Sequence, residues 1–162
     1  MPQTRVFIHG LESTSQGTKG VYFHNHYPDM IIEDFSGSLD ERMDKLTAIL
    51  KGKNRLILVG SSYGGLMAAI FAGRHPERVD KLILLAPALS LPEYEPYRQK
   101  HLQIPVTIYH GRFDDVVMPD AVRKIAEEVF SRLTYHLVDE DHSLNRIFPD
   151  LPWDDLLEGK GK

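Results

Sequence analysis

A serine, an aspartate and a histidine are spaced along this chain in an order that could support nucleophilic chemistry. The serine lies in the pentad Gly60-Ser61-Ser62-Tyr63-Gly64. A serine hydroxyl is a weak nucleophile unless a sharp strand-to-helix turn presents it to a base and to backbone N–H groups that bind an oxyanion. In such a turn, Cβ atoms two positions away on either side would collide with the backbone. Only Ser62 has glycine at both of these positions, so Ser62 rather than Ser61 is the candidate nucleophile.

The two partners that an activated serine needs both follow downstream. A histidine must accept the serine proton, and an acid must orient that histidine and stabilise its charged form. Asp114 lies three residues after Gly111, beyond an apolar segment, and His142 follows a short acidic run. Asp115 competes with Asp114 for the role of the acid, and the spacing from the glycine favours Asp114. The order serine, aspartate, histidine is that of enzymes with a nucleophile elbow, and it differs from the orders in chymotrypsin and subtilisin.

Six segments between and around these residues have the composition of β-strands. Most are near-continuous apolar runs, which are typical of strands covered on both faces in a largely parallel sheet. The last one alternates apolar and polar residues, as a less buried strand at the edge of the sheet would. The six segments are residues 5–9, 30–32, 55–59, 81–86, 105–110 and 133–138.

Three helices are predicted between the strands. Residues 39–50 carry an apolar stripe, and Ser38 with Glu41 forms a capping-box pair at the start. A second helix follows Pro119, which suits a first helical turn. The helix that follows Ser62, at residues 65–74, is apolar on all sides, so we expect it to be the most buried.

Strands that alternate with helices predict an α/β fold, a three-layer α/β/α sandwich with a mostly parallel sheet of about six strands. Ligands of such sheets bind at the carboxyl ends of the strands, where the candidate residues would lie. The length of 162 residues predicts a single domain over residues 1–162, with a frayed tail at residues 158–162.

The sequence resembles the α/β-hydrolase superfamily, and especially its small, lidless bacterial serine esterases. The resemblance implies a minimal α/β-hydrolase fold with Ser62, Asp114 and His142 as the catalytic triad. It also implies an oxyanion hole made by the backbone N–H groups of Tyr63 and Leu11. It spans nearly the whole chain and rests on Val6-Phe7-Ile8-His9-Gly10, residues 60–65, His75-Pro76-Glu77-Arg78-Val79, Leu84-Leu85-Ala86-Pro87, residues 111–117 and His142-Ser143.

The region in which many members of this superfamily insert a lid holds only residues 87–103 here. Two prolines in it, Pro92 and Pro96, discourage a long helix. We therefore expect an open site for small or short-chain esters. The apolar residues that could line an acyl or alcohol pocket are Leu89, Leu91, Tyr94 and Tyr97.

Composition narrows the classes of partner and cofactor. The chain has no cysteine, which excludes disulfides, thiolate catalysis and cysteine-based metal sites. His24 and His26 lack an accompanying carboxylate at ligand spacing, so we expect no metal, and the chemistry needs no cofactor. We expect His9 to be structural, hydrogen-bonding to hold the loop that follows it. A formal net charge of −4 gives no excess of basic residues to bind the phosphates of a nucleic acid, so we expect no nucleic-acid partner. The apolar runs are too short to span a membrane.

The sequence predicts a cofactor-independent serine hydrolase, a carboxylesterase that acts on a small-molecule ester through an acyl-enzyme. A start without an apolar leader segment predicts a cytoplasmic protein. Two alternatives stay open: a thioesterase or acyltransferase with the same triad, and a binding protein on a hydrolase scaffold with little turnover. The oligomeric state is left open.

Overall fold

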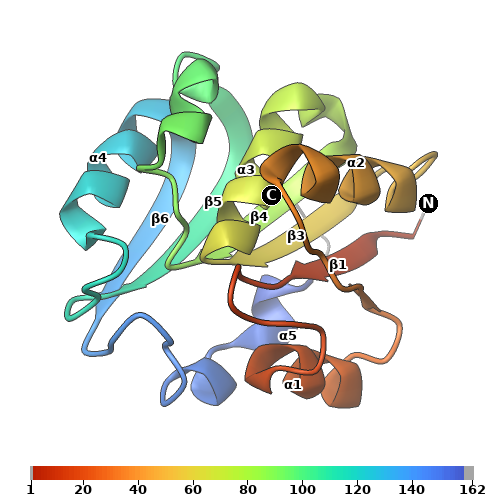
Figure 1. The fold of residues 1–162 in the computed structure, drawn as a ribbon, viewed down its shortest axis with the longest axis horizontal. Coiled ribbons are helices and arrows are strands. Elements are labelled where there is room, and N and C mark those ends of the chain that lie inside the picture. The colour runs from red at the N-terminus through yellow and green to blue at the C-terminus, as the bar shows by residue number, and fades with distance from the viewer. Residues whose placement is uncertain (1, 159–162) are drawn as a thin grey trace.

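The computed structural model describes residues 2–158, and it contains one six-stranded sheet (Figure 1). All strand pairs are parallel, and the strands are ordered β2-β1-β3-β4-β5-β6. The strands are β1 (Thr4–Ile8), β2 (Ile31–Ile32), β3 (Leu56–Ser61), β4 (Val79–Leu85), β5 (Leu102–Gly111) and β6 (Phe130–Val138). The predicted fold class and all six predicted strands are confirmed.

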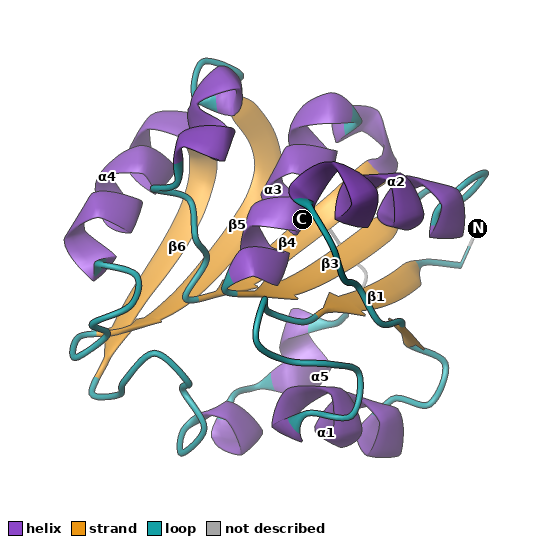
Figure 2. Ribbon diagram, viewed as in Figure 1, coloured by secondary structure: helices purple, strands orange, loops and turns teal. Residues whose placement is uncertain are grey.

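Helices cover both faces of this sheet, so the molecule has three layers (Figure 2). One face carries α2 (Leu39–Ile49), α3 (Tyr63–Arg74) and α4 (Pro119–Val129), and the other carries α1 (Thr18–His26) and α5 (Trp153–Leu156). Parallel strands joined by crossover helices end at the same edge of the sheet. The loops after β1, β3, β5 and β6 therefore gather at one edge, where the candidate residues lie.

Each face of the sheet has its own hydrophobic core. The larger core joins α2, α3 and α4 to the sheet, and its fully buried strand members include Leu58, Leu84 and Ile108. The smaller core lies under α1 and α5, and it combines aliphatic side chains of the strands with a cluster of aromatic rings, which we call the aromatic core. Phe23 is its centre, because its ring lies 5.4 Å from Phe148 and 4.8 Å from Trp153.

The helices predicted from periodicity are present, and their local signals act as expected. Ser38 Oγ accepts from the Glu41 N–H at 3.1 Å, and the Glu41 carboxylate accepts from the Ser38 N–H at 2.9 Å, which completes the capping box. α3 is buried from Gly64 to Gly73, in accordance with its uniformly apolar sequence. β6 lies at the edge of the sheet and has the predicted alternating exposure.

The two helices on the other face were not predicted. α1 contains Gly20, ends in His24-Asn25-His26 and has no side-chain cap, so its sequence gives no helical signal. Its helical form follows from tertiary packing, since Phe23 is fully buried in the aromatic core. α5 has only four residues. Of the expected frayed tail, residues 159–162 lie outside the described residues.

The segment after β4 contains only a short 3-10 helix, Pro92–Tyr97, so the predicted absence of a long lid helix is confirmed. No helix within residues 2–158 has the length and apolarity needed to cross a lipid bilayer.

Candidate active site

Ser62 lies at the sharp turn between β3, which ends at Ser61, and α3, which begins at Tyr63. Its backbone has φ 55° and ψ −113°, a conformation that L-residues rarely adopt. Such strain costs on the order of 1–3 kcal/mol and persists only where the surroundings impose it. The turn projects the Ser62 side chain into the space above the strand ends.

The two flanking glycines are required by close backbone contacts. A Cβ atom on Gly60 would overlap the carbonyl of Gly64, and one on Gly64 would overlap the carbonyl oxygens of Ile8 and His9. Backbone atoms of a packed sheet cannot move aside as a flexible side chain can. The glycine spacing therefore belongs to the elbow, and it explains why the sequence selects Ser62.

The backbone of Ser62 is also hydrogen-bonded to the neighbouring strand. Its N–H donates to the Leu85 carbonyl at 2.8 Å, and its carbonyl accepts from the N–H of Ala88 at 3.0 Å. The same carbonyl accepts from the N–H groups of Gly65 and Leu66 in the first turn of α3. Ser62 is thereby held between the end of β4 and the start of α3.

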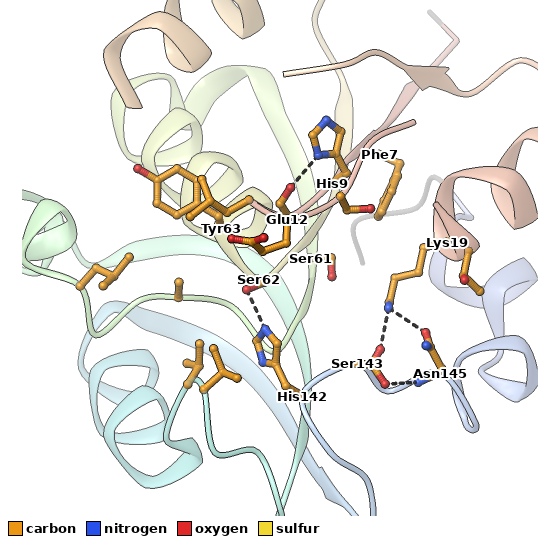
Figure 3. Close-up of a pocket in the computed structure, with 18 of the residues that line it drawn as sticks. Phe7, His9, Glu12, Lys19, Ser61, Ser62, Tyr63, His142, Ser143 and Asn145 are labelled. Atoms are coloured by element: carbon orange, nitrogen blue, oxygen red, sulfur yellow. Dashed lines mark hydrogen bonds between the residues drawn. The ribbon is translucent and has the colours of Figure 1, made fainter. Parts of the chain in front are cut away.

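The structure brings the three candidate catalytic side chains into one hydrogen-bonded chain. Ser62 Oγ lies 2.9 Å from His142 Nε2, and His142 Nδ1 lies 2.7 Å from Asp114 Oδ2 (Figure 3 shows the serine–histidine contact). These distances suit a histidine that carries its proton on Nδ1 and accepts the serine proton on Nε2. The residues lie in the loops after β3, β5 and β6.

Asp114 is buried and held rigidly, whereas Asp115 is exposed. The second oxygen of Asp114, Oδ1, accepts from the backbone N–H groups of Val116 and Val117 at 2.9 and 2.8 Å. His110 Nε2 lies 3.1 Å from Asp114 Oδ2, and burial lowers the pKa of His110. The surroundings therefore hold the carboxylate with neutral donors.

Leu11 and Tyr63, whose N–H groups are the two expected oxyanion donors, line the same cavity as Ser62. Tyr63 is the first residue of α3, so its N–H has no partner within the helix. Within residues 2–158, no acceptor is found for the N–H of Tyr63 or Leu11. His9 is buried and fixes the loop before Leu11, because its Nε2 accepts from the Phe35 N–H at 2.9 Å and its Nδ1 donates to the Gly10 carbonyl at 2.7 Å.

Comparison with models of protein families identifies the family of this chain. Residues 12–99, more than half of the chain, match the model of the alpha/beta hydrolase fold family. The chain belongs to the α/β-hydrolase fold family. The matched segment contains Ser62 and Tyr63, whereas Asp114 and His142 lie beyond it and are joined to Ser62 by the fold.

Solved structures of other α/β-hydrolase fold proteins are similar over almost the full chain. Alpha/beta hydrolase domain-containing protein 10 from mouse has a TM-score of 0.79 at 22% identity, with 96% of this chain and 89% of that chain covered. A monoacylglycerol lipase from Paleococcus ferrophilus has a TM-score of 0.74 at 15% identity and coverages of 96% and 94%. Est1E from Butyrivibrio proteoclasticus with bound ferulic acid has a TM-score of 0.78 at 16% identity and coverages of 100% and 90%. A search of curated proteins gave no match.

A cavity of about 570 Å³ opens at the triad of this α/β hydrolase. Ser62, Tyr63 and His142 line it, together with residues from the loops after β1, β4, β5 and β6 and from the start of α1. Its volume suits a small organic ligand. The other lining residues are Phe7, His9, Gly10, Leu11, Glu12, Ser13, Thr18, Lys19, Ser61, Ala88, Ser90, Leu91, Val116, Val117, Ser143 and Asn145.

Of the four residues expected to line a substrate pocket, only Leu91 does so. Leu89 and Tyr94 are buried in the larger core, at 1% and 0% exposure. Tyr97 lies against α3, where its hydroxyl accepts from Arg74 Nε at 2.9 Å. The expectation for Leu89, Tyr94 and Tyr97 is therefore corrected, because the loop after β4 folds these side chains down onto α3 and away from Ser62.

Sequence reasoning missed several residues that the structure brings to the cavity. Val116 and Val117 follow Asp114 directly, so the recognised loop could have indicated them. Lys19 had no such signal, since it contacts the carbonyl of Ser143, 124 positions away. Burial lowers the pKa of Lys19. A cationic group thus lies in the wall of a cavity that the sequence predicted to be apolar.

His24 and His26, which were not expected to bind metal, are exposed on α1. The ring of His26 stacks on Tyr22 with centroids 4.0 Å apart, and its Nδ1 lies 2.9 Å from the Tyr22 carbonyl. In the part of the chain that the structure describes, no group of three or more histidine, aspartate or glutamate side chains is arranged to hold a metal ion.

Proposed function

We propose that this α/β hydrolase is a serine carboxylesterase that cleaves small or short-chain carboxylic esters. The observation that carries the proposal is the continuous chain from Ser62 Oγ through the His142 ring to Asp114, at 2.9 and 2.7 Å. A chain of this geometry activates an alcohol at neutral pH without a metal or an organic cofactor. The cavity at the triad supports a small-molecule substrate.

In the proposed reaction, Ser62 Oγ attacks the ester carbonyl carbon while its proton moves to His142 Nε2. The carbonyl π bond becomes an oxyanion, which the N–H groups of Leu11 and Tyr63 bind. Asp114 stabilises the imidazolium through the Nδ1–H. Each oxyanion donor contributes roughly 3 kcal/mol to the stability of the transition state.

Collapse of this intermediate breaks the bond to the alcohol part of the ester, and His142 gives its proton to the departing oxygen. A water molecule then attacks the acyl-enzyme, with the same histidine as base, and releases the acid and free Ser62. The open cavity, which lacks a long lid helix above it, supports access of water to the acyl-enzyme.

A labelling experiment tests this proposal. Wild-type protein should react with a fluorophosphonate and hydrolyse p-nitrophenyl acetate and butyrate, and Ser62→Ala should lose the label and lower kcat at least about a thousandfold. Ser61→Ala is the matched control, because it removes the neighbouring hydroxyl and should retain the label. Equal behaviour of wild type and Ser62→Ala in both assays would refute the proposal. A further assay, with a panel of thioesters and with added alcohols, separates esterase activity from thioesterase or acyltransferase activity.

A further inference from the structure

The cavity has two chemically different sides. Ala88 and Val117 belong to the larger core, and Tyr63 and Leu91 pack against it, so this side is mainly apolar. On the other side the wall is formed by the start of α1 and the loop after β6, with Lys19, Ser143 and Asn145. In Figure 3, Tyr63 and Lys19 lie on opposite sides of Ser62. A substrate bound at Ser62 would therefore extend between an apolar wall and a cationic one.

Lys19 is held at the cavity wall by two hydrogen bonds (Figure 3). Its Nζ donates to the Ser143 carbonyl at 2.6 Å and to Asn145 Oδ1 at 3.3 Å. The ammonium also lies 5.5 Å from the centre of the Phe148 ring. An ammonium has three N–H donors, so one remains for a ligand.

The charge of Lys19 is not neutralised by direct contact. Within residues 2–158, no carboxylate lies within 4 Å of its ammonium. Two nearby carboxylates attract the ammonium without touching it. Their oxygens are bound by other groups: Asp141 accepts from the N–H and hydroxyl of Ser143, and Glu140 accepts from the Ile147 N–H. A half-buried cation without an ion-pair partner is unfavourable, and an anionic ligand in the cavity would relieve this.

We propose that the ester substrate carries a carboxylate, and that Lys19 binds this carboxylate while Ser62 attacks the ester carbonyl. The inference rests on the proposed esterase function and specifies its substrate class. Glu12 also lines this cavity, on the loop that follows β1, and its carboxylate repels an anion bound near it. The carboxylate of the substrate is thereby favoured at the wall formed by α1 and the loop after β6.

Pairs of esters that differ only in charge test the proposal. Monoethyl glutarate and ethyl isoheptanoate have nearly the same shape, with the carboxylate on the acyl part. The butyrate ester of β-hydroxypropionate and isoamyl butyrate make the same comparison on the alcohol part. Wild-type protein should show a kcat/KM at least about tenfold higher for the charged member of one pair, the lower end expected for a hydrogen bond to a charged group. No preference in either pair would overturn the proposal.

Variants of Lys19 assign the preference to this side chain. Lys19→Gln keeps a hydrogen-bond donor near Ser143 but removes the charge, so the ratio of kcat/KM values should fall about tenfold. Lys19→Arg should retain more of the ratio than Lys19→Gln. Lys124→Gln removes the same charge from the exposed face of α4 and should leave the ratio unchanged. If Lys19→Gln lowered kcat/KM equally for the charged and the neutral ester, Lys19 would only support the loop after β6, and the proposal would be wrong.

A binding measurement separates this inference from the proposed activity. Isothermal calorimetry with the non-hydrolysing Ser62→Ala protein should show tighter binding of the charged ester than of its neutral isostere. Adding Lys19→Gln to this variant should weaken binding of the charged ester about tenfold. If these results were found while wild-type protein turned over none of the esters, the esterase proposal would fail and the carboxylate site would stand. Equal binding of the two esters would overturn the carboxylate site itself.

Discussion

The two faces of the sheet are built differently and contribute differently to the site. The face with α2, α3 and α4 has a large aliphatic core, and α3, which begins beside Ser62, is buried along nearly its whole length. The face with α1 and α5 is thin, and its smaller core has a cluster of aromatic rings around Phe23. The first face positions the nucleophile, and the second places a charged group beside it.

This division separates the parts of the site that perform chemistry from those that select a ligand. The elbow, the histidine and the aspartate depend on strand ends and on α3, which form the rigid centre of the molecule. Lys19 depends on a short helix whose position is set by side-chain packing. Lys19 nevertheless meets the triad at one point, because it donates to the carbonyl of Ser143, the residue after His142.

The largest expected effect comes from removing the negative charge that Asp114 places beside His142. Asp114→Asn should lower kcat about 10⁴-fold, because an amide at this position favours the wrong tautomer of His142. The measurement is kcat for p-nitrophenyl butyrate, with circular dichroism as a check of folding. Asp115→Asn is the matched control and should stay near wild type, since Asp115 is exposed. The reverse result would assign the acid to Asp115.

A pair of phenylalanines sharpens the comparison between the two faces. Phe23 lies in the aromatic core and Phe71 lies on α3, and both are 0% exposed, so replacement of either by alanine should lower the free energy of unfolding by about 3–5 kcal/mol. Only Phe23→Ala should also reduce the preference for charged esters, because α1 carries Lys19. Urea unfolding and the kcat/KM ratio measure the two effects. An equal loss of preference in Phe71→Ala would contradict the division of roles.

The smallest expected effect concerns His110, which is buried and lies against Asp114. Burial lowers its pKa below the usual value of 6.5, so the folded protein binds fewer protons than the unfolded chain in this range. The stability that follows from a neutral His110 is therefore present above about pH 6.5 and is lost as the pH falls through the lowered value. Urea unfolding between about pH 7 and pH 5 should show a steeper loss in wild type than in His110→Gln. Equal slopes would show that His110 does not titrate differently on folding.

The sequence predicted the catalytic side of the molecule in some detail because its signals are local. The glycines around Ser62, the capping box at Ser38 and the apolar strands each act over a few residues. The order of the loops then placed Asp114 and His142 at the same edge of the sheet, and the structure brings both within hydrogen-bond distance of their partners.

The other face could not be predicted in the same way, because its structure depends on contacts between distant parts of the chain. α1 has no apolar stripe and is stabilised by Phe148 and Trp153, more than a hundred residues later. Tyr94 looked like a pocket residue because it lies in the short segment after β4, yet that segment folds onto α3 and buries it. Lys19 is held at the cavity wall by a hydrogen bond to Ser143, in the loop after β6.

The hydrogen bonds that join the peptide groups of Ser62 to Leu85 and Ala88 have a consequence for the time course of binding. A nucleophile fixed in this way is preorganised when the chain folds, so no reorganisation of the elbow has to accompany ligand entry. Any adaptation to the ligand is then confined to surface side chains such as Leu11 and Val116, which are 51% and 67% exposed at the rim of the cavity. Rotamer changes of exposed side chains at such a rim occur within nanoseconds.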